Sequence, residues 1–333
     1  MNWITLLPMM LVLAPSAGSP PSPLAHTFSI VARDPTTGEL GVAVQSHYFS
    51  VGPIVPWAQA GVGAVATQSL VLVDYGPMGL DLMRAGMSAQ QALDSLVKAD
   101  AHNDGRQVAM VDAKGTVAAY TGKNCIPDAG QHSGNQYSVQ ANLMANDKVW
   151  PAMAEAYEKA QGDLAERLLQ ALEAGQKAGG DIRGKQSAAI LVVRAQSTGK
   201  PWKDWVYNLR VEDNLEPIRE LRRLVRLQRA YNLNNQGDDF IAEKKTAEAM
   251  AAYEEAAKLA PEVVELKFWA ALTMYTSGRE ADGLRMFREV FSRERLWVDL
   301  IPRLAKVGLF PNDPKKIEEV QRQMPRTRMS RGR

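Results

Sequence analysis

The sequence predicts an α+β fold in which sheets of mainly antiparallel strands stack between layers of helices, followed by an all-helical region. Up to residue 211, short apolar runs bounded by turn residues alternate with helical segments, in the order strands, helices, strands, helices, strands. From Pro217 onward, apolar residues instead recur at helical spacing. A chain of 333 residues is long enough for two such domains.

Three apolar runs begin the sheet-forming part of the chain, at residues 27–33, 38–46 and 61–69. A tight turn joins the first two, because the segment from Asp34 to Gly38 carries a proline, which fixes φ, and a glycine, which accepts positive φ. Successive strand side chains point to opposite faces, so Thr27, Ser29 and Arg33 share one face. We expect these three side chains to be exposed towards one cleft, where they would form the floor of a reaction site.

Alternating helices and strands follow. Ser88 and Gln91 have the spacing of a capping box and predict the start of a helix, and residues 112–115 have the composition of a hairpin turn. The other helices are expected at 78–85, 149–160 and 164–177. Further strands are expected at 107–111, 116–120, 137–143, 187–194 and 205–211, and the almost wholly apolar run at 187–194 predicts a central strand.

The region from 214 to 308 is predicted to be a helical domain with a repeat. One set of residues sits at the offsets of a tetratricopeptide unit: Leu233, Gly237, Phe240, Ala249, Tyr253, Ala256 and Pro261. A looser second copy follows: Ala271, Met274, Gly283, Phe287 and Val290. Such a unit cannot bury its face alone, so helices around 221–233 and 296–307 would cap it. The domain either stabilises the first one or binds a protein partner.

The two ends of the chain are predicted to lie outside these domains. Residues 1–25 combine an apolar run, Ile4 to Leu13, with a small and proline-rich stretch, which is typical of a signal peptide and too short to span a bilayer. Cleavage is expected after Ser16 or Ala17, or after Ala25, with no integral membrane segment remaining, and the protein would be secreted or periplasmic. Residues 309–333 form a basic tail that includes Arg326, Arg328, Arg331 and Arg333.

Composition excludes several classes of function. A formal net charge of +2 argues against a nucleic-acid binder that relies on a large basic surface. The single cysteine, Cys125, cannot form an internal disulfide or a cysteine-based zinc site. The four histidines show no metal-ligand spacing. We therefore expect neither a metal nor another cofactor.

Several motifs in the first domain resemble family ten twenty-eight of the domains of unknown function. They are Thr-Phe-Ser-Ile-Val-Ala-Arg-Asp, Gly-Val-Ala-Val-Gln-Ser, Val-Pro-Trp-Ala, Gly-Val-Gly-Ala-Val-Ala-Thr-Gln, Tyr75-Gly76-Pro77, Thr121-Gly122 with Cys125, Tyr137-Ser138-Val139-Gln140, and Gly179-Gly180-Asp181 with Arg183-Gly184 and Gln186-Ser187-Ala188. The resemblance covers roughly residues 26 to 213, in the right order. It implies a four-layer αββα sandwich of the N-terminal-nucleophile (Ntn) hydrolase type for residues 26–213.

The same resemblance implies a catalytic nucleophile at Thr27. An Ntn hydrolase attacks with the side chain of its first residue, and the free α-amine of that residue acts as the base. This chain departs from the family, because His26 precedes the threonine and one further residue must be removed after cleavage at Ala25. The alternative is that Thr27 is an ordinary β-branched strand residue.

Other candidate residues are chosen for their chemistry. Ser29 and Arg33 could orient an anionic group, although an arginine stem can also simply cover a sheet. Gln68 and Asn142 could donate hydrogen bonds to an oxyanion, beside Ala141, where the family more often has glycine. Asp181 and Arg183 lie in a glycine-rich loop that either holds an ion pair or presents charges to a substrate. Cys125 is either a thiol nucleophile or a buried structural residue.

The leading hypothesis is an exported Ntn-type hydrolase that cleaves an amide bond in a small or peptide-like substrate. The alternative is a noncatalytic module that uses the sandwich as a ligand scaffold and residues 214–308 to dock a protein partner. A homo-oligomer is compatible with either hypothesis.

Overall fold

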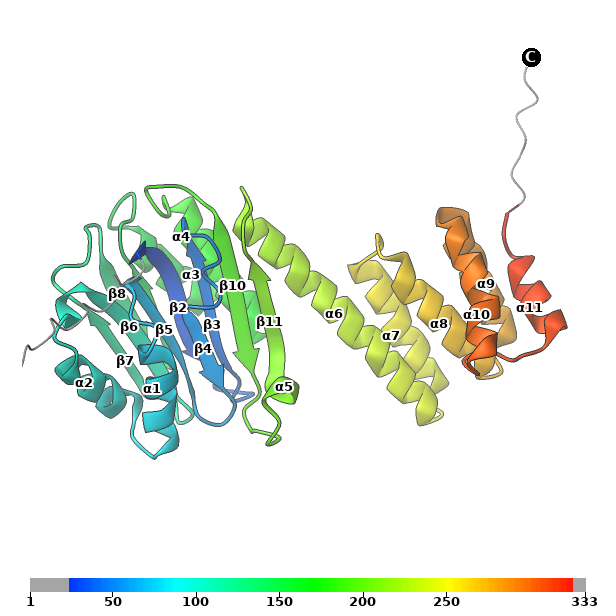
Figure 1. Cartoon of the computed structure of the whole chain (residues 1–333), viewed down its shortest axis with the longest axis horizontal. Coiled ribbons are helices and arrows are strands. Elements are labelled where there is room, and N and C mark those ends of the chain that lie inside the picture. The colour runs from blue at the N-terminus through cyan, green and yellow to red at the C-terminus, as the bar shows by residue number, and fades with distance from the viewer. Residues whose placement is uncertain (1–23, 326–333) are drawn as a thin grey trace, which may run out of the picture.

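Two antiparallel sheets lie face to face at the centre of the first domain (Figure 1). The computed structural model describes residues 24–325. The first sheet contains β1 (Leu24–Ala25), β4 (Pro56–Gln59), β5 (Gly63–Leu70), β6 (Arg106–Asp112) and β7 (Val117–Thr121), in the order β1-β5-β6-β7 with β4 also paired to β5. The second runs β11 (Trp205–Val211), β10 (Ser187–Val193), β3 (Leu40–Ser46), β2 (Thr27–Arg33), β9 (Tyr137–Ala141), β8 (Gly130–Gly134).

Helices cover the outer face of each sheet. α1 (Tyr75–Arg84) and α2 (Ala89–Ala99) pack on the first sheet, in a cluster that includes Val65, Val108 and Leu93. α3 (Val149–Lys159) and α4 (Leu164–Lys177) pack on the second, in a cluster that includes Phe28 and Leu168. A third cluster, with Val42 and Ala66, fills the space between the sheets. The layers are therefore helix, sheet, sheet, helix, and the predicted mixed α+β fold with antiparallel sheets is confirmed.

The alternation predicted for the first strand is also present. Thr27, Ser29 and Val31 face the other sheet, whereas Phe28 and Ile30 face α3 and α4. β2 lies between β3 and β9, and its pairing with β3 places Thr27 opposite Ser46. The capping box at Ser88 and the turn at 112–115 have the expected hydrogen bonds. β1, β4, β8 and the short helix α5 (Pro201–Asp204) were not predicted.

The C-terminal region consists of helices packed in pairs. α6 (Pro217–Ala242) packs antiparallel to α7 (Thr246–Leu259), and α8 (Val264–Thr276) packs on α9 (Glu280–Arg293). A 3-10 helix (Arg295–Leu300), α10 (Ile301–Lys306) and α11 (Pro314–Gln321) complete it. Figure 1 shows α6 leaving the sandwich beside β11 and leading to the other helices. Ala249 and Tyr253 are buried between helices, with Phe240 partly buried against them. The predicted helical character of this region is confirmed.

Part of the predicted basic tail is folded, which corrects the boundary at residue 309. Phe310 and Val320 are buried in the core of the last helices, where Phe310 stacks on Tyr275 of α8 and Val320 belongs to α11, which packs on α10. The four tail arginines and the predicted signal peptide up to residue 23 lie outside the described residues. Among residues 24–325, no helix is both long enough and apolar enough to cross a membrane.

Candidate functional site

A cluster of buried polar side chains lies between the sheets at the end where β2 begins. Its members are His26, Thr27, Ser29, Ser46, Gln68, Gln107, Gln140 and Asn142, and none is more than 3% exposed. They come from β2, β3, β5, β6, β9 and the residues that flank them. Buried polar groups are costly unless they are hydrogen-bonded, so the bonds made inside this cluster indicate what it is built to hold.

The backbone carbonyl of His26 accepts two side-chain hydrogen bonds at this end of the cluster. It accepts a hydrogen bond of 2.6 Å from Ser46 Oγ and one of 2.7 Å from Arg183 Nη2. One of these two donors is a full positive charge, and charge-assisted bonds are about twice as strong as neutral ones. This carbonyl belongs to the peptide bond that joins His26 to Thr27. Its oxygen therefore occupies a position suited to an oxyanion.

The Thr27 hydroxyl lies next to this carbonyl. Thr27 Oγ1 donates to the backbone oxygen of Ala25 at 2.8 Å and lies 3.1 Å from Ser46 Oγ. Ser46 therefore contacts both the hydroxyl of Thr27 and the oxygen of the bond that precedes it. The backbone oxygen of Thr27 is held separately, by the backbone N–H of Asn142 at 3.1 Å and by Gln68 Nε2 at 3.2 Å.

A chain of side-chain hydrogen bonds fixes the amides around Thr27. Gln140 Nε2 donates to Ser29 Oγ, and Ser29 Oγ donates to Gln68 Oε1, each at 2.6 Å. Gln107 Oε1 then accepts from Gln68 Nε2 at 2.7 Å and from Asn142 Nδ2 at 2.9 Å. Gln68 and Asn142 thus donate to Thr27 O and to Gln107 rather than to the His26 carbonyl. They orient the threonine, and the oxyanion position is served by other groups.

Arg183 is held in place by Asp181. The carboxylate of Asp181 accepts from Arg183 Nε at 3.0 Å and from Nη2 at 2.7 Å, and it also accepts from the backbone N–H of His47. The Asp181 side chain is fully buried, whereas that of Arg183 is 29% exposed. The predicted ion pair in this loop is therefore present, and its guanidinium also bonds to the carbonyl that precedes Thr27. Contact of these charges with a substrate stays a prediction.

Two non-glycine residues beside the cluster have left-handed backbones. Ser69, which follows Gln68, has φ of 75°, and Leu143, which follows Asn142, has φ of 58°. Such conformations cost about 1–3 kcal/mol each and persist where the surrounding structure imposes them. In each case the strain falls directly after an amide that contacts Thr27. The placement of these two amides is therefore maintained at a cost in stability.

The surroundings of His26 disfavour its protonation. Burial is the main cause that lowers the pKa of its imidazole below 6.5, and the positive charge of Arg183 lowers that pKa further, against the opposing effect of the hydrogen bond to Asn142. His26 Nδ1 lies 2.8 Å from Asn142 Oδ1. Because that oxygen accepts, the imidazole donates from Nδ1.

The expected exposure of Thr27, Ser29 and Arg33 towards one cleft is wrong. Thr27 and Ser29 are completely buried, because the first sheet and residues 24–26 cover them. Arg33 is six residues away, about 20 Å along the strand, and its guanidinium donates to Ala113 O at 2.9 Å and to Gln136 Oε1 at 2.6 Å. Arg33 thus holds the hairpin turn at the opposite end of the sheets.

Cys125 lies outside the hydrogen-bond chain around Thr27. Its Sγ contacts the backbone oxygen of Arg106 at 3.4 Å, and burial raises the pKa of the thiol, which disfavours the reactive thiolate. With Thr121 it lines a cavity of about 520 Å3. Thr121 in turn accepts from Gln107 Nε2 at 3.0 Å, so this cavity adjoins the far end of the polar cluster.

Sequence reasoning missed Ser46. It stands in the quoted motif Gly-Val-Ala-Val-Gln-Ser, but it was not singled out. The register of the hairpin could have identified it. A tight turn at residues 34–39 fixes the sum of the residue numbers of each pair of opposite residues in the two strands, and this sum places residue 27 opposite residue 46.

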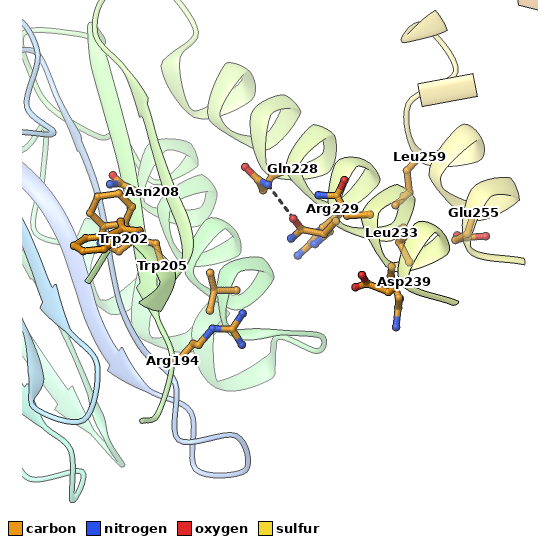
Figure 2. A pocket seen from close by; sticks show the side chains of 14 residues that line it. Arg194, Trp202, Trp205, Asn208, Gln228, Arg229, Leu233, Asp239, Glu255 and Leu259 are labelled. Carbon is orange, nitrogen blue, oxygen red and sulfur yellow. Dashed lines mark hydrogen bonds between the residues drawn. The ribbon is translucent and has the colours of Figure 1, made fainter. Parts of the chain in front are cut away.

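A different cavity lies between the two domains (Figure 2). Its volume is about 890 Å3, and it is bounded by β11 and α5 on one side and by α6 and α7 on the other. Trp202 and Trp205 are 66% and 47% exposed. Amide and charged side chains of α6, among them Gln228 and Asp239, form the opposite wall (Figure 2).

Among residues 24–325, no group of three or more His, Cys, Asp or Glu side chains is arranged to hold a metal ion.

Comparison with known proteins identifies a family and related solved structures. A family model described as a family of unknown function (DUF1028) matches residues 27–221. The crystal structure of protein SPO2555 from Silicibacter pomeroyi, itself assigned to DUF1028, is similar to this chain, with 29% sequence identity and a TM-score of 0.55. The match covers 60% of this chain and 88% of that one. None of the curated proteins matches this chain.

Proposed function

Since the chain belongs to the family of unknown function DUF1028, we propose that its first domain is an exported Ntn-type hydrolase that cleaves an amide bond with Thr27 as nucleophile. The observation that carries this proposal is the pair of donors, Ser46 Oγ and Arg183 Nη2, on the carbonyl oxygen that precedes the Thr27 hydroxyl. The helix–sheet–sheet–helix layering supports an Ntn-type sandwich.

The proposed reaction begins when the bond between His26 and Thr27 is cut, which frees the Thr27 amine. That amine takes the hydroxyl proton, and Oγ1 adds to the acyl carbon of the substrate. Ser46 and Arg183 donate to the resulting oxyanion at the position of the present His26 oxygen. The amide C–N bond breaks as its nitrogen receives the proton, and water then hydrolyses the ester on Thr27.

The roles of the other residues follow from their contacts. Asp181 keeps the Arg183 guanidinium aligned through two hydrogen bonds. Gln68 and Asn142 hold the Thr27 backbone, and Ser29 links Gln68 to Gln140. In this scheme Arg33 has no catalytic part, and Cys125 stays a protonated structural thiol.

The nucleophile is tested by intact mass and amino-terminal sequencing, combined with turnover of the para-nitroanilides of acetylated amino acids. We expect active protein to begin at Thr27, Thr27→Ser to retain part of the turnover, and Thr27→Ala to abolish it while the circular dichroism spectrum is unchanged. Loss of one nucleophile of this kind costs several orders of magnitude in rate. Turnover by protein that still carries His26, unaffected by Thr27→Ala, would contradict the proposal.

The cavity between the domains supports a second candidate function, the docking of a protein partner. Its exposed indoles are of the kind enriched at interfaces. Docking can accompany hydrolysis or replace it. A photo-crosslinking residue at position 236 of the full chain, expressed in its native host, should capture one discrete protein, and Trp202→Ala should reduce that product. Absence of a discrete product would remove this candidate.

A further inference from the structure

The residues before Thr27 occupy a defined path along the first sheet. Leu24 and Ala25 form β1, which pairs antiparallel with β5 at Leu70 and Ser69. The same edge of β5 pairs with β4 at residues 63–66, so β1 fills the end of that edge. Leu24 and Ala25 are thereby held in an extended conformation by backbone pairing and lead directly to His26 and its carbonyl.

Each of the three side chains in this segment has a different environment. Leu24 is 53% exposed, whereas Ala25 is fully buried in the apolar cluster between the sheets. His26 is 3% exposed, and its Nδ1 lies 2.8 Å from Asn142 Oδ1. In order along the chain, the path offers an open position, a small apolar position and a buried position with an amide acceptor.

We infer that this path, defined by the contacts of residues 24–26, is the acyl-binding groove of the enzyme and that the substrate is an extended peptide. The residue on the acyl side of the cleaved bond has a side chain that hydrogen-bonds to Asn142, and the residue before it is as small as alanine. The inference rests on the proposed hydrolysis for its catalytic meaning, but the binding of the peptide does not depend on turnover.

The backbone pairing is the reason for a peptide rather than a smaller amide. Once residues 24–26 leave, the edge of β5 at Ser69 and Leu70 loses its partner. Unpaired backbone groups at a strand edge are a template for another extended chain. A peptide restores the pairing made by Leu24 and Ala25 and places its own carbonyl between Ser46 and Arg183. In the hydrolysis, this peptide supplies the acyl carbon and its C-terminal portion leaves as the amine.

The test uses the full chain with the groove opened by substitution. Ala25→Trp puts a large side chain where there is no space and displaces the segment, while Leu24→Trp adds the same indole at an exposed position as the matched control. The probe is a fluorescent acetyl-Leu-Ala-His amide, and its binding is followed by polarisation. Because an occupied site reduces apparent affinity by the fraction that is open, Ala25→Trp should bind at least about tenfold more tightly than the unmodified uncut chain or Leu24→Trp.

Two further measurements check the identity of the groove. A chain that begins at residue 27 and carries Thr27→Ala should also bind the probe. Acetyl-Leu-Trp-His amide should bind to that chain at least about tenfold more weakly than the probe does. Replacing the probe histidine by alanine should weaken binding to the opened chain. This loss of affinity should be about threefold smaller when the chain also carries Asn142→Ala than when Asn142 is present. Absence of binding to both opened forms, or equal binding to open and occupied forms, would overturn the inference.

The outcomes separate this inference from the proposed function. Peptide binding by the opened chain without any turnover in protein that begins at Thr27 would sustain the groove and remove the hydrolase. Turnover of an unrelated amide in protein that does not bind the probe would sustain the hydrolase and overturn the groove.

Discussion

At the scale of single residues, His26 links the site to pH. Burial lowers the pKa of its imidazole below 6.5 in the folded chain, so the unfolded chain binds more protons between that ordinary value and the lowered one. The contribution of His26 to the free energy of unfolding is therefore fully present above pH 6.5. It falls as the pH is lowered towards the pKa of the folded chain. Protonation also places a positive charge near Arg183, so we expect it to weaken the binding of residues 24–26 in the groove.

The prediction is that urea midpoints of the chain decrease between pH 7.5 and pH 5.5 more steeply than those of His26→Gln. Glutamine retains a donor but has no proton to gain, so the difference between the two slopes isolates the histidine from carboxylates that also titrate. Equal slopes for the two proteins would show that the His26 pKa is not lowered.

Strand alternation predicted that Thr27, Ser29 and Arg33 lie on one face of the strand. It did not indicate that Arg33 is too far from Thr27 to belong to the same site. Six residues of extended chain separate Thr27 from Arg33, so a shared face does not make a shared site. Burial was mispredicted for a different reason. Whether a polar strand face borders a cleft depends on what covers it. Here the cover is the first sheet together with residues 24–26, and the pairing of Leu24 and Ala25 with β5 is too short to give a periodic signal.

At the scale of elements, the helix pairs show why local patterns succeed in some places. Gly237 in α6 was singled out from its spacing to Tyr253, and the structure brings them together. A Cβ on Gly237 would stand 2.4 Å from the Tyr253 ring. β4, β8 and α11 were missed because each is short and lacks an apolar run of its own. They are formed through pairing or packing with neighbours rather than through local preference.

The α6–α7 contact gives a prediction whose sign is informative. In a helix interior, glycine to alanine usually stabilises a protein by about 0.5–1 kcal/mol. At Gly237 the added methyl meets a buried ring, so Gly237→Ala should instead destabilise the chain by about 1–3 kcal/mol, as other overpacked sites do. Thermal and urea unfolding of the variant measure this change. A stabilised variant would contradict the close packing of the two helices.

At the scale of the whole molecule, α6 belongs to both regions. Its first turns place Ile218, Leu221 and Val225 in the core beneath the second sheet, and Arg222 pairs with Glu166 and Glu173 of α4. Its last turns pack against α7. The change to helical spacing from Pro217 predicted helical structure, and α6 begins at that residue. It could not show that this helix completes the first core, because helical periodicity does not specify which surface a helix covers.

Because α6 packs in both regions, the position at which the chain is truncated should determine the stability of the first domain. A chain that ends at residue 213 loses the α6 side chains Ile218, Leu221 and Val225, which pack in the core of the first domain. A chain that ends at residue 242 keeps them, and both chains lack every later helix. Burial of each such side chain contributes about 1.5–3 kcal/mol, so the shorter chain should unfold at a much lower urea concentration or fail to fold. Adding Leu221→Ala to the longer chain should cost about 2–5 kcal/mol of that difference, since Leu221 is fully buried. Equal urea midpoints for the two truncated chains would show that the sandwich is complete without α6, and that the helical region is an independent attachment.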